Sequence, residues 1–401
     1  MTGKAVFPGG NAQSLNDVAG QPIAEYVHTK SGTVHKLEGP VNAKNIVFKA
    51  TGDYNDGDTW ILNNTPVAVT YNGGEELLPT AVLVGDVLQA VVMGNQVRLM
   101  LQKPTPQENL LRNGDWESGI INQQAKDEYT HGGYTIDGWH VNKLQGMKLK
   151  VLQDKISIEN LVEIPSAAVW APSQDIESAE RFQGEILTVA AVIDRADDNW
   201  YLFIRAGGDD NTYILGLSQK VKTGLNTISF TVPAGTKFIK CGLFTSNQPA
   251  GKSVEARKIK LEPGKRFTGW PAWDYGAELA KCQRYQIEIF DKKITGQSYL
   301  AQVKANRSTS AYGILPIPVS MRDGVIPVIE TDCSDDNPYL AFGIFSSGYI
   351  HNGKITKINI KSKMNNGFIL EAIGSNFVAG NDYQIYVENT NMRHFLLNAN
   401  L

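Results

Sequence analysis

The chain has 401 residues, of which 42% are apolar and 20% are charged, so it can bury the cores of roughly two or three ordinary domains and is not intrinsically disordered. Its 38 basic and 41 acidic residues give a net charge of −3, which argues against a protein that wraps nucleic acid or binds an anionic membrane. Three cysteines cannot all pair within one chain, and none lies in a Cys-x-x-Cys motif. We therefore expect neither a disulfide framework nor a structural zinc site.

No segment has the character of a targeting or membrane-spanning sequence. Residues 1–13 lack the apolar stretch of a secretion signal. The most apolar segment, 81–93, is interrupted by Asp86 and Gln89 and is shorter than the roughly 20 residues that a membrane-spanning helix needs. We expect synthesis in a cytoplasm and no membrane insertion.

Apolar and polar residues alternate along most of the chain, which is the pattern of half-buried β-strands. Residues 60–71 form two apolar runs around Asn63-Asn64, and this predicts a β-hairpin. Three later segments repeat the pattern: 186–204 with a turn at 195–198, 226–245 with a turn at 233–236, and 354–374 with Asn366-Gly367 at its turn. Strands that recur every roughly 8–12 residues are typical of β-sandwiches and barrels. The sequence therefore predicts an all-β protein.

One segment has the period of a helix instead. Residues 274–286 place Tyr275, Leu279 and Cys282 near one face, and Asp274 is a suitable N-cap. We expect a short connecting helix there, with Cys282 as a small buried apolar residue rather than a reactive thiol.

Composition also divides the chain. A proline-stiffened polar linker at 103–109 follows the first strand-rich block, and 270–273 ends the second. The predicted parts are a small N-terminal β domain (1–103, with its first 35 or so residues extended), a central β domain (109–272), the helix (273–286) and a C-terminal β-sandwich (287–401).

The sequence nominates no catalytic site. Its six histidines are scattered outside any metal-binding motif, and we expect His28 and His35, seven residues apart in a polar segment, to lie in a solvated loop. Three acidic clusters stand in predicted turns: Asp194/Asp197/Asp198, Asp209/Asp210 and Asp332/Asp335/Asp336. Such clusters could hold a structural calcium ion, but Asp also favours turns for backbone reasons, so we expect no cofactor.

Tryptophan is concentrated in the central block, where it could bind sugars or fill a core. We assign Trp116 and Trp139 to the core. Trp170, before Pro172, and Trp200, beside an acidic turn, are the candidates for stacking on a sugar ring. Asp209 and Asp210 are the candidates for binding its hydroxyl groups.

Several strings in fixed order resemble phage and prophage tail-fibre proteins. Residues 110–141 contain Asn113-Gly114-Asp115-Trp116, Asn122-Gln123-Gln124 and Tyr134-Thr135-Ile136-Asp137-Gly138-Trp139, which are similar to the opening of a jelly-roll domain of that family. Trp116 and Gly138 depart from its usual phenylalanine and arginine. The closing string of the domain is matched by Lys260-Leu261-Glu262-Pro263-Gly264 and Thr268-Gly269-Trp270.

The resemblance continues beyond the jelly roll. Residues 278–285 look like the helix that follows it, 318–322 resemble a strand of the family's C-terminal domain, and 397–401 echo its terminus. Residues 50–54 and 57–60 resemble fibre anchoring modules more loosely and equally fit a generic small β domain.

The resemblance implies a central jelly-roll β-sandwich like a carbohydrate-binding module in a homotrimeric virion protein. It implies an N-terminal block attached to the phage tail or baseplate, and β domains that bind host surface polysaccharide without enzymatic activity. Such a protein is assembled in the bacterial cytoplasm and acts at the host cell surface. Two alternatives are a structural part of the baseplate or a head fibre without receptor binding, and a glycan depolymerase.

Overall fold

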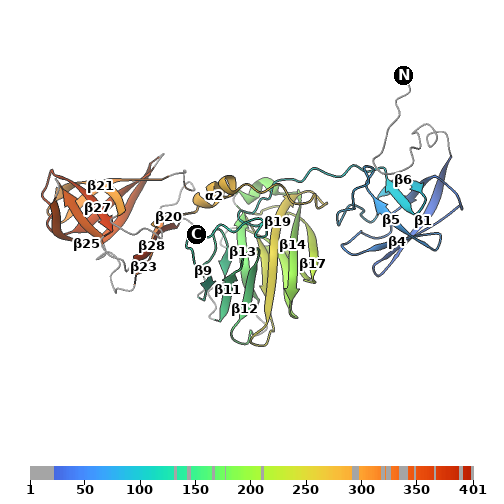
Figure 1. Ribbon diagram of the computed structural model, residues 1–401, viewed down its shortest axis with the longest axis horizontal. Helices are drawn as coiled ribbons and strands as arrows, with labels where there is room; N and C mark the ends of the chain where they lie inside the picture. Colours follow the sequence, from blue (N-terminus) through green and yellow to red (C-terminus); the bar gives the residue numbers. More distant parts are fainter. Residues whose placement is uncertain are drawn as a thin grey trace, which may run out of the picture. The chain divides into compact units, whose positions relative to one another are not determined.

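The computed structural model describes residues 22–130, 133–141, 146–164, 168–176, 178–208, 212–290, 298–317, 321, 327–333, 342–346, 349–364, 367–387 and 392–398. Strands dominate these residues, with one α-helix and a short 3-10 helix at Ala179–Phe182 (Figure 1). The predicted all-β class is confirmed. No helix in the described part of the chain is long and apolar enough to cross a membrane.

The N-terminal part forms a closed barrel with strand order β1-β2-β4-β5-β7-β6-β3. Its strands are β1 (Ile23–Ser31), β2 (Val34–Glu38), β3 (Asn45–Lys49), β4 (Thr59–Leu62), β5 (Thr65–Thr70), β6 (Val87–Met93) and β7 (Gln96–Leu99). The predicted hairpin is β4–β5, and Asn63 and Asn64 form its turn with φ of 45° and 67°. The expectation of an extended first 35 residues is wrong from Ile23 onward, because β1 pairs with both β2 and β3.

A chain of buried polar side chains crosses the inside of this barrel. His28 and His35 are only 2% and 0% exposed, so their assignment to a solvated loop is wrong. His28 Nδ1 accepts a hydrogen bond from the Thr51 N–H at 2.9 Å, and His35 Nε2 lies 3.0 Å from Asp58 Oδ2. The His35 ring also stacks on Trp60 with centroids 4.2 Å apart. The sequence analysis missed their burial because both histidines have polar neighbours in the chain. In β1 and β2 those neighbours face outward, whereas the two imidazole rings face the barrel interior.

The central part is a sandwich of two six-stranded sheets, β16-β15-β18-β13-β10-β9 and β17-β14-β19-β12-β11-β8. Strands of both sheets, among them β13 and β19, are labelled in Figure 1. The first sheet contains β9 (Gly133–Tyr134), β10 (His140–Val141), β13 (Val169–Ile176), β15 (Trp200–Gly207), β16 (Tyr213–Lys220) and β18 (Phe238–Thr245). The second contains β8 (Glu128–Tyr129), β11 (Met147–Val151), β12 (Ile156–Asn160), β14 (Ile186–Ala196), β17 (Gly224–Thr231) and β19 (Ser253–Pro263). Two facing antiparallel sheets agree with the jelly-roll expectation.

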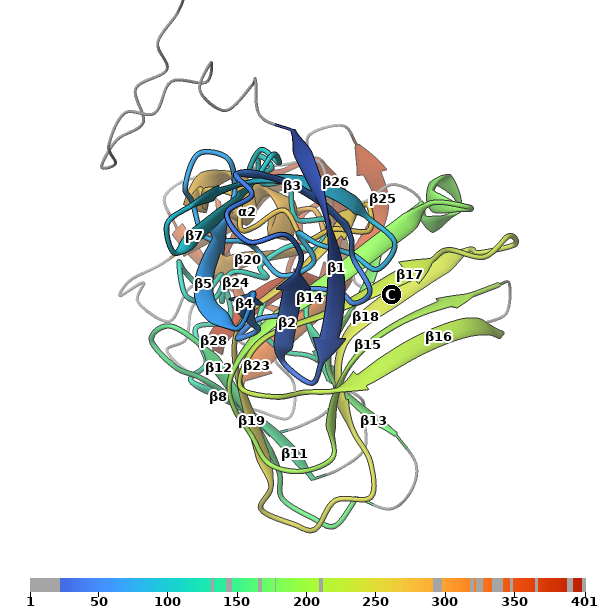
Figure 2. The same cartoon turned by 90° about the vertical axis from the view of Figure 1, so that its right-hand side faces the viewer.

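Two predicted hairpins of this part are wrong. β14 and β15 belong to different sheets, and so do β17 and β18, so both connections cross from one sheet to the other. β14 pairs instead with β17, and β15 with β16 (Figure 2). A period of two tells which face of a strand is buried, but it does not tell which strand is the hydrogen-bonding partner.

The motif residues at the start of the sandwich lie inside it. Trp116 and Trp139 are 0% exposed, as predicted, and their rings meet edge to face at 5.1 Å. Asn113 bonds through its side chain to the backbone of Ile121 and Asp137, and its carbonyl accepts the Trp139 indole N–H at 2.7 Å. These residues therefore hold the opening loop of the sandwich together.

Asp137 is a fully buried carboxylate in the same region. It accepts hydrogen bonds from the backbone N–H of Gln123 at 2.7 Å and from the Gln123 side-chain amide at 2.5 Å. Burial raises the pKa of Asp137 to about 6, although these hydrogen bonds and the charge of Arg112 oppose that change. This buried carboxyl can thus change its charge near neutral pH.

The closing motif is also internal. Lys260 and Glu262 are 0% exposed and form an ion pair at 2.9 Å. Lys260 Nζ also donates to the Gly269 carbonyl at 2.6 Å, and Glu262 accepts the Thr268 N–H at 3.0 Å. Burial lowers the pKa of Lys260, whereas the hydrogen bond and charge of Glu262 raise it. This network fastens the segment after β19 to that strand.

The predicted helix is α2 (Tyr275–Gln283), which is shorter than 274–286. Asp274 caps it as expected, since its side chain accepts the Ala277 N–H at 2.7 Å. Glu278 accepts the Asn113 N–H at 2.9 Å. Cys282 is 1% exposed, and burial raises its thiol pKa well above the ordinary value, which agrees with an inert apolar role.

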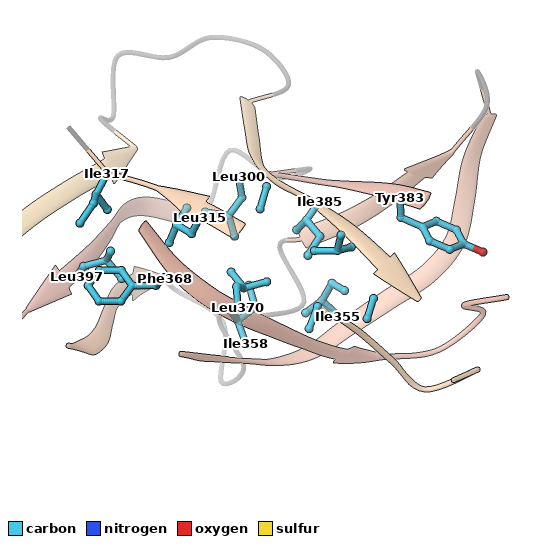
Figure 3. Packing of buried hydrophobic residues seen from close by; sticks show 14 of the residues in the cluster. Leu300, Leu315, Ile317, Ile355, Ile358, Phe368, Leu370, Tyr383, Ile385 and Leu397 are labelled. Carbon is cyan, nitrogen blue, oxygen red and sulfur yellow. The ribbon is translucent and has the colours of Figure 1, made fainter. Parts of the chain in front are cut away.

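The C-terminal part differs from the predicted sandwich, because its main sheet closes into a barrel with order β21-β22-β26-β25-β24-β27. These strands are β21 (Ser298–Arg307), β22 (Ser310–Pro316), β24 (Phe342–Ser346), β25 (Tyr349–Met364), β26 (Gly367–Gly374) and β27 (Asp382–Val387). A three-stranded sheet, β20-β28-β23, contains β20 (Gln286–Phe290), β23 (Val328–Cys333) and β28 (Met392–Asn398). Figure 3 shows Leu315, Phe368, Leu370 and Ile385 in the apolar core.

The predicted hairpin at 354–374 is confirmed as β25–β26, in which Met364 lies opposite Gly367. Of the two predicted turn residues, Gly367 is the first residue of β26, and Asn366 lies outside the described residues. In the motif at 318–322 only Met321 belongs to the described residues, and in the closing string at 397–401 only Leu397 and Asn398 do.

Candidate functional site

The outer face of one sandwich sheet gathers charged groups beside an exposed aromatic ring. On β15, Trp200, Leu202 and Ile204 are 0% exposed and face the core. By alternation Tyr201, Phe203 and Arg205 take the other face of the strand, where Phe203 is only 2% exposed and Arg205 is partly exposed. β16, at the edge of the sheet, lies beside β15 with Gly216 opposite Arg205.

Gly216 makes room for two larger side chains. A methyl group on Gly216 would come within 2.4 Å of the Tyr213 hydroxyl and 3.0 Å of the Arg205 Cβ. Tyr213 and Arg205 therefore converge over this glycine on the outer face. Tyr213 nevertheless stays 60% exposed, so most of its surface is open to solvent.

Two more charges lie on the neighbouring strands. Asp175 of β13 forms an ion pair with Lys240 of β18 at 3.2 Å, and both remain partly exposed. Burial lowers the pKa of the Arg205 guanidinium, while the charge of Asp175 and the presence of Tyr213 raise it. We call Asp175, Arg205, Tyr213 and Lys240 the Tyr213 face.

The Tyr213 face offers what a polar ring-shaped ligand needs. An exposed tyrosine presents an apolar ring surface together with a hydroxyl group. A carboxylate accepts hydrogen bonds from ligand hydroxyls, and guanidinium and ammonium groups donate to ligand oxygens. These four side chains come from four adjacent strands of one sheet, β16, β15, β18 and β13.

The sequence-predicted site residues have different outcomes. Trp200 is 0% exposed, so its assignment to a sugar-stacking surface is wrong and the ring is part of the sandwich core. Trp170 is partly exposed on β13, with its ring centroid 5.1 Å from that of Phe244, so its role stays a prediction. Asp209 and Asp210 lie outside the described residues.

The remaining acidic clusters do not assemble a metal site among the described residues, where no three metal-ligating side chains converge. In the 194–198 turn, Asp198 pairs with Lys220 at 3.0 Å and Asp197 lies 3.8 Å from Arg195. The side chains of the third cluster, Asp332, Asp335 and Asp336, lie outside the described residues.

Sequence reasoning missed Arg205 and Tyr213. Strand parity contained part of the signal for Arg205, because Trp200 and Arg205 have opposite parity, but Phe203, which has the parity of Arg205, is apolar and buried. The position of the second sheet must be known before one can tell which side of β15 faces the core. Tyr213 can approach Arg205 only because residue 216 is a glycine.

No protein-family model matches the chain, and no curated protein matches it. Similar solved structures include the enzymatically active domain of tailspike protein 4 of bacteriophage CBA120, with 14% identity, a TM-score of 0.26, and coverage of 39% of this chain and 21% of that one. A CBM4 structure has 17% identity and a TM-score of 0.26, covering 38% of this chain and 99% of that one. TmCBM61 in complex with β-1,4-galactotriose has 15% identity and a TM-score of 0.22, covering 39% and 100%. The chain thus spans about a fifth of the tailspike chain.

Proposed function

We propose that this chain is a non-enzymatic glycan-binding protein of the phage tail-fibre type, which binds host surface polysaccharide through the Tyr213 face. The observation that carries the proposal is the convergence of an exposed tyrosine and a guanidinium over Gly216, with an aspartate–lysine pair on the next strands. Sugars have apolar ring faces edged by hydroxyl groups, and this combination of side chains complements both.

The tail-fibre-like motifs support the proposal in a specific way. Asn113, Asp137, Trp139, Lys260 and Glu262 are all buried and bonded to other protein groups. They therefore build the sandwich and leave its outer face free to differ between proteins that bind different receptors. The domain limits, 109–272 for the sandwich and 287–401 for the C-terminal part, are those drawn from composition and remain part of the proposal.

Further parts of the proposal follow from the resemblance alone. The N-terminal block attaches the protein to the phage tail or baseplate, and the chain is a homotrimer of the virion, made in the host cytoplasm. Three identical weak sites on one rigid assembly gain avidity without any new contact. Light scattering checks the trimer, with an expected mass of about three chains; a stable monomer at micromolar concentration would contradict it.

Competitive adsorption tests the function. Purified, trimer-verified protein should coat host cells and block infection, and a glycan array should identify the bound sugar. Tyr213→Ala should weaken glycan binding by about tenfold or more, the loss of roughly one stacked ring. The matched control is Tyr275→Ala, which removes an equally exposed tyrosine (56% against 60%) from α2.

Three results would overturn the proposal. If Tyr213→Ala and Tyr275→Ala weaken glycan binding equally, the Tyr213 face is not the binding site. If the protein binds no susceptible host surface, it is not a receptor-binding protein. Release of reducing ends from host polysaccharide would instead establish a depolymerase. Antibody labelling of the virion then separates a distal tail fibre from a head fibre or a structural baseplate component.

A further inference from the structure

Side chains of four adjacent strands form a row on the outside of the C-terminal barrel. Lys304 of β21 lies opposite Tyr312 of β22, Tyr312 opposite Glu371 of β26, and Glu371 opposite Asn359 of β25. Opposed residues of antiparallel strands project from the same face of the sheet. Because Val303 and Ala305 are buried in the barrel core, Lys304 and its row point outward.

A second row runs beside the first. Arg307 lies opposite Ser310, Ser310 opposite Ile373, and Ile373 opposite Lys357. These residues are two or three positions from members of the first row and share its face. We call the eight residues of the two rows, together with Lys361 of β25, the Tyr312 face.

Glu371 organises the centre of this face. It accepts hydrogen bonds from the Tyr312 hydroxyl at 2.5 Å and from the Asn359 amide at 2.9 Å, and it pairs with Lys361 at 2.7 Å. These three donors lower the pKa of Glu371 to about 2. The Glu371 carboxylate is therefore ionised and bonded to three protein groups, and it positions the Tyr312 and Lys361 side chains.

The cations around this centre outnumber the carboxylates. Lys304, Arg307, Lys357 and Lys361 are all exposed, whereas Glu371 and the Asp382 opposite Lys304 are the only acids in register with the two rows as described. No described carboxylate lies within ion-pair distance of Arg307 or Lys357. The face is therefore positive on a chain whose net charge is −3.

We propose that the Tyr312 face is a second binding site, separate from the Tyr213 face, for an anionic polysaccharide. Carboxylate or phosphate groups of the polymer bind Arg307 and Lys357, and a sugar ring packs on Tyr312. The carboxylates of Glu371 and of Asp382, opposite Lys304, disfavour nucleic acid, whose backbone carries a charge about every 1.7 Å of duplex axis. A polysaccharide with one charge per sugar or fewer can place its charges between them.

Binding of the full-length protein to four polymers tests this site: polygalacturonate for carboxylates, wall teichoic acid for phosphates, dextran as a neutral control, and duplex DNA. The double variant Arg307→Gln/Lys357→Gln should bind its acidic polymer about tenfold more weakly at low salt, because two charge attractions are lost, and the difference should shrink as salt screens them. The matched control, Lys36→Gln/Lys49→Gln, removes the same charge from exposed positions of the N-terminal barrel and should have little effect.

Each outcome of these binding measurements supports or contradicts the proposed site on the Tyr312 face. A loss of acidic-polymer binding in the Arg307/Lys357 variant, but not in the Lys36/Lys49 control, supports the site. The acidic polymer that binds more tightly shows whether the site prefers carboxylate or phosphate groups. Equal losses in both double variants, tighter binding of DNA, or no binding of either acidic polymer would overturn it. The proposed function fails separately, because Tyr213→Ala should leave binding of the acidic polymer unchanged.

Discussion

His28 donates a hydrogen bond from Nε2 to Nδ1 of His35 across 2.9 Å inside the N-terminal barrel. The direction follows from the backbone, because His28 Nδ1 already accepts the Thr51 N–H and so cannot carry the proton in a neutral ring. His35 must then donate from Nε2 to Asp58. Both rings are thus neutral links in one ordered chain of hydrogen bonds.

This arrangement predicts acid sensitivity of the N-terminal barrel. Burial, with help from the charges of His35 and Lys30, lowers the pKa of His28 from 6.5 to about 4. The unfolded state therefore binds the proton more readily, and the barrel should lose up to about 3 kcal/mol of stability as the pH falls from 6.5 to 4. Hydrogen exchange of β1–β3 peptides measures this loss. His28→Gln should flatten the pH dependence, whereas the exposed control Lys36→Gln should not.

Asp137 predicts the opposite pH dependence for the sandwich. Its pKa is about 6 in the folded protein against 3.8 in the unfolded chain, so folding favours the protonated form. The stability of the sandwich should fall by up to about 3 kcal/mol as the pH rises from 4 to above 6. Asp137→Asn should abolish this slope in urea unfolding followed between pH 5 and 8. An unchanged slope would assign the effect to another group.

Breaking the buried Lys260–Glu262 pair should be costly. Lys260→Met leaves Glu262 charged and unpaired inside the sandwich, which costs about 3–5 kcal/mol. The matched control is Lys155→Met, because the Lys155–Glu255 pair has nearly the same length, 2.8 Å, but is partly exposed. That change should cost less than about 1 kcal/mol. Thermal unfolding compares the two, and similar losses would mean that water reaches Lys260.

Two tryptophans of the sandwich should respond differently to truncation. Trp200→Ala removes a fully buried ring and should cost about 3–5 kcal/mol. Trp170→Ala removes a partly exposed ring that contacts Phe244, and it should cost clearly less. Circular dichroism during thermal unfolding measures both. Equal destabilisation would place Trp170 in the core and end its candidacy as a sugar-binding residue.

Structural features that depend only on residues close together in the chain could be predicted from the sequence. Asn63-Asn64 predicted a tight hairpin because asparagine tolerates positive φ, and Asp274 predicted the start of α2 because its side chain reaches an N–H three residues later. The assignment of Trp116 and Trp139 to the core was also correct.

Predictions that depended on the partner of a strand were less successful. The segments around 195–198 and 233–236 alternate like hairpins but connect two sheets, since the apolar residues of β14 and β15 face each other across the core rather than pairing in one sheet. The same ambiguity hid the closed C-terminal barrel. It also placed Trp200 on the wrong side of its strand.

The sequence by itself determined the all-β class, the capped helix and the core positions of Trp116 and Trp139, because alternation, turn chemistry and capping act over a few residues. Only the tertiary structure decided which side chains share a surface. Asp175 meets Lys240, and Tyr312 meets Glu371, across 65 and 59 residues of chain respectively, because sheet register brings distant strands together. Register is set by the packing of whole sheets, so both proposed binding faces could be located only after the chain was folded.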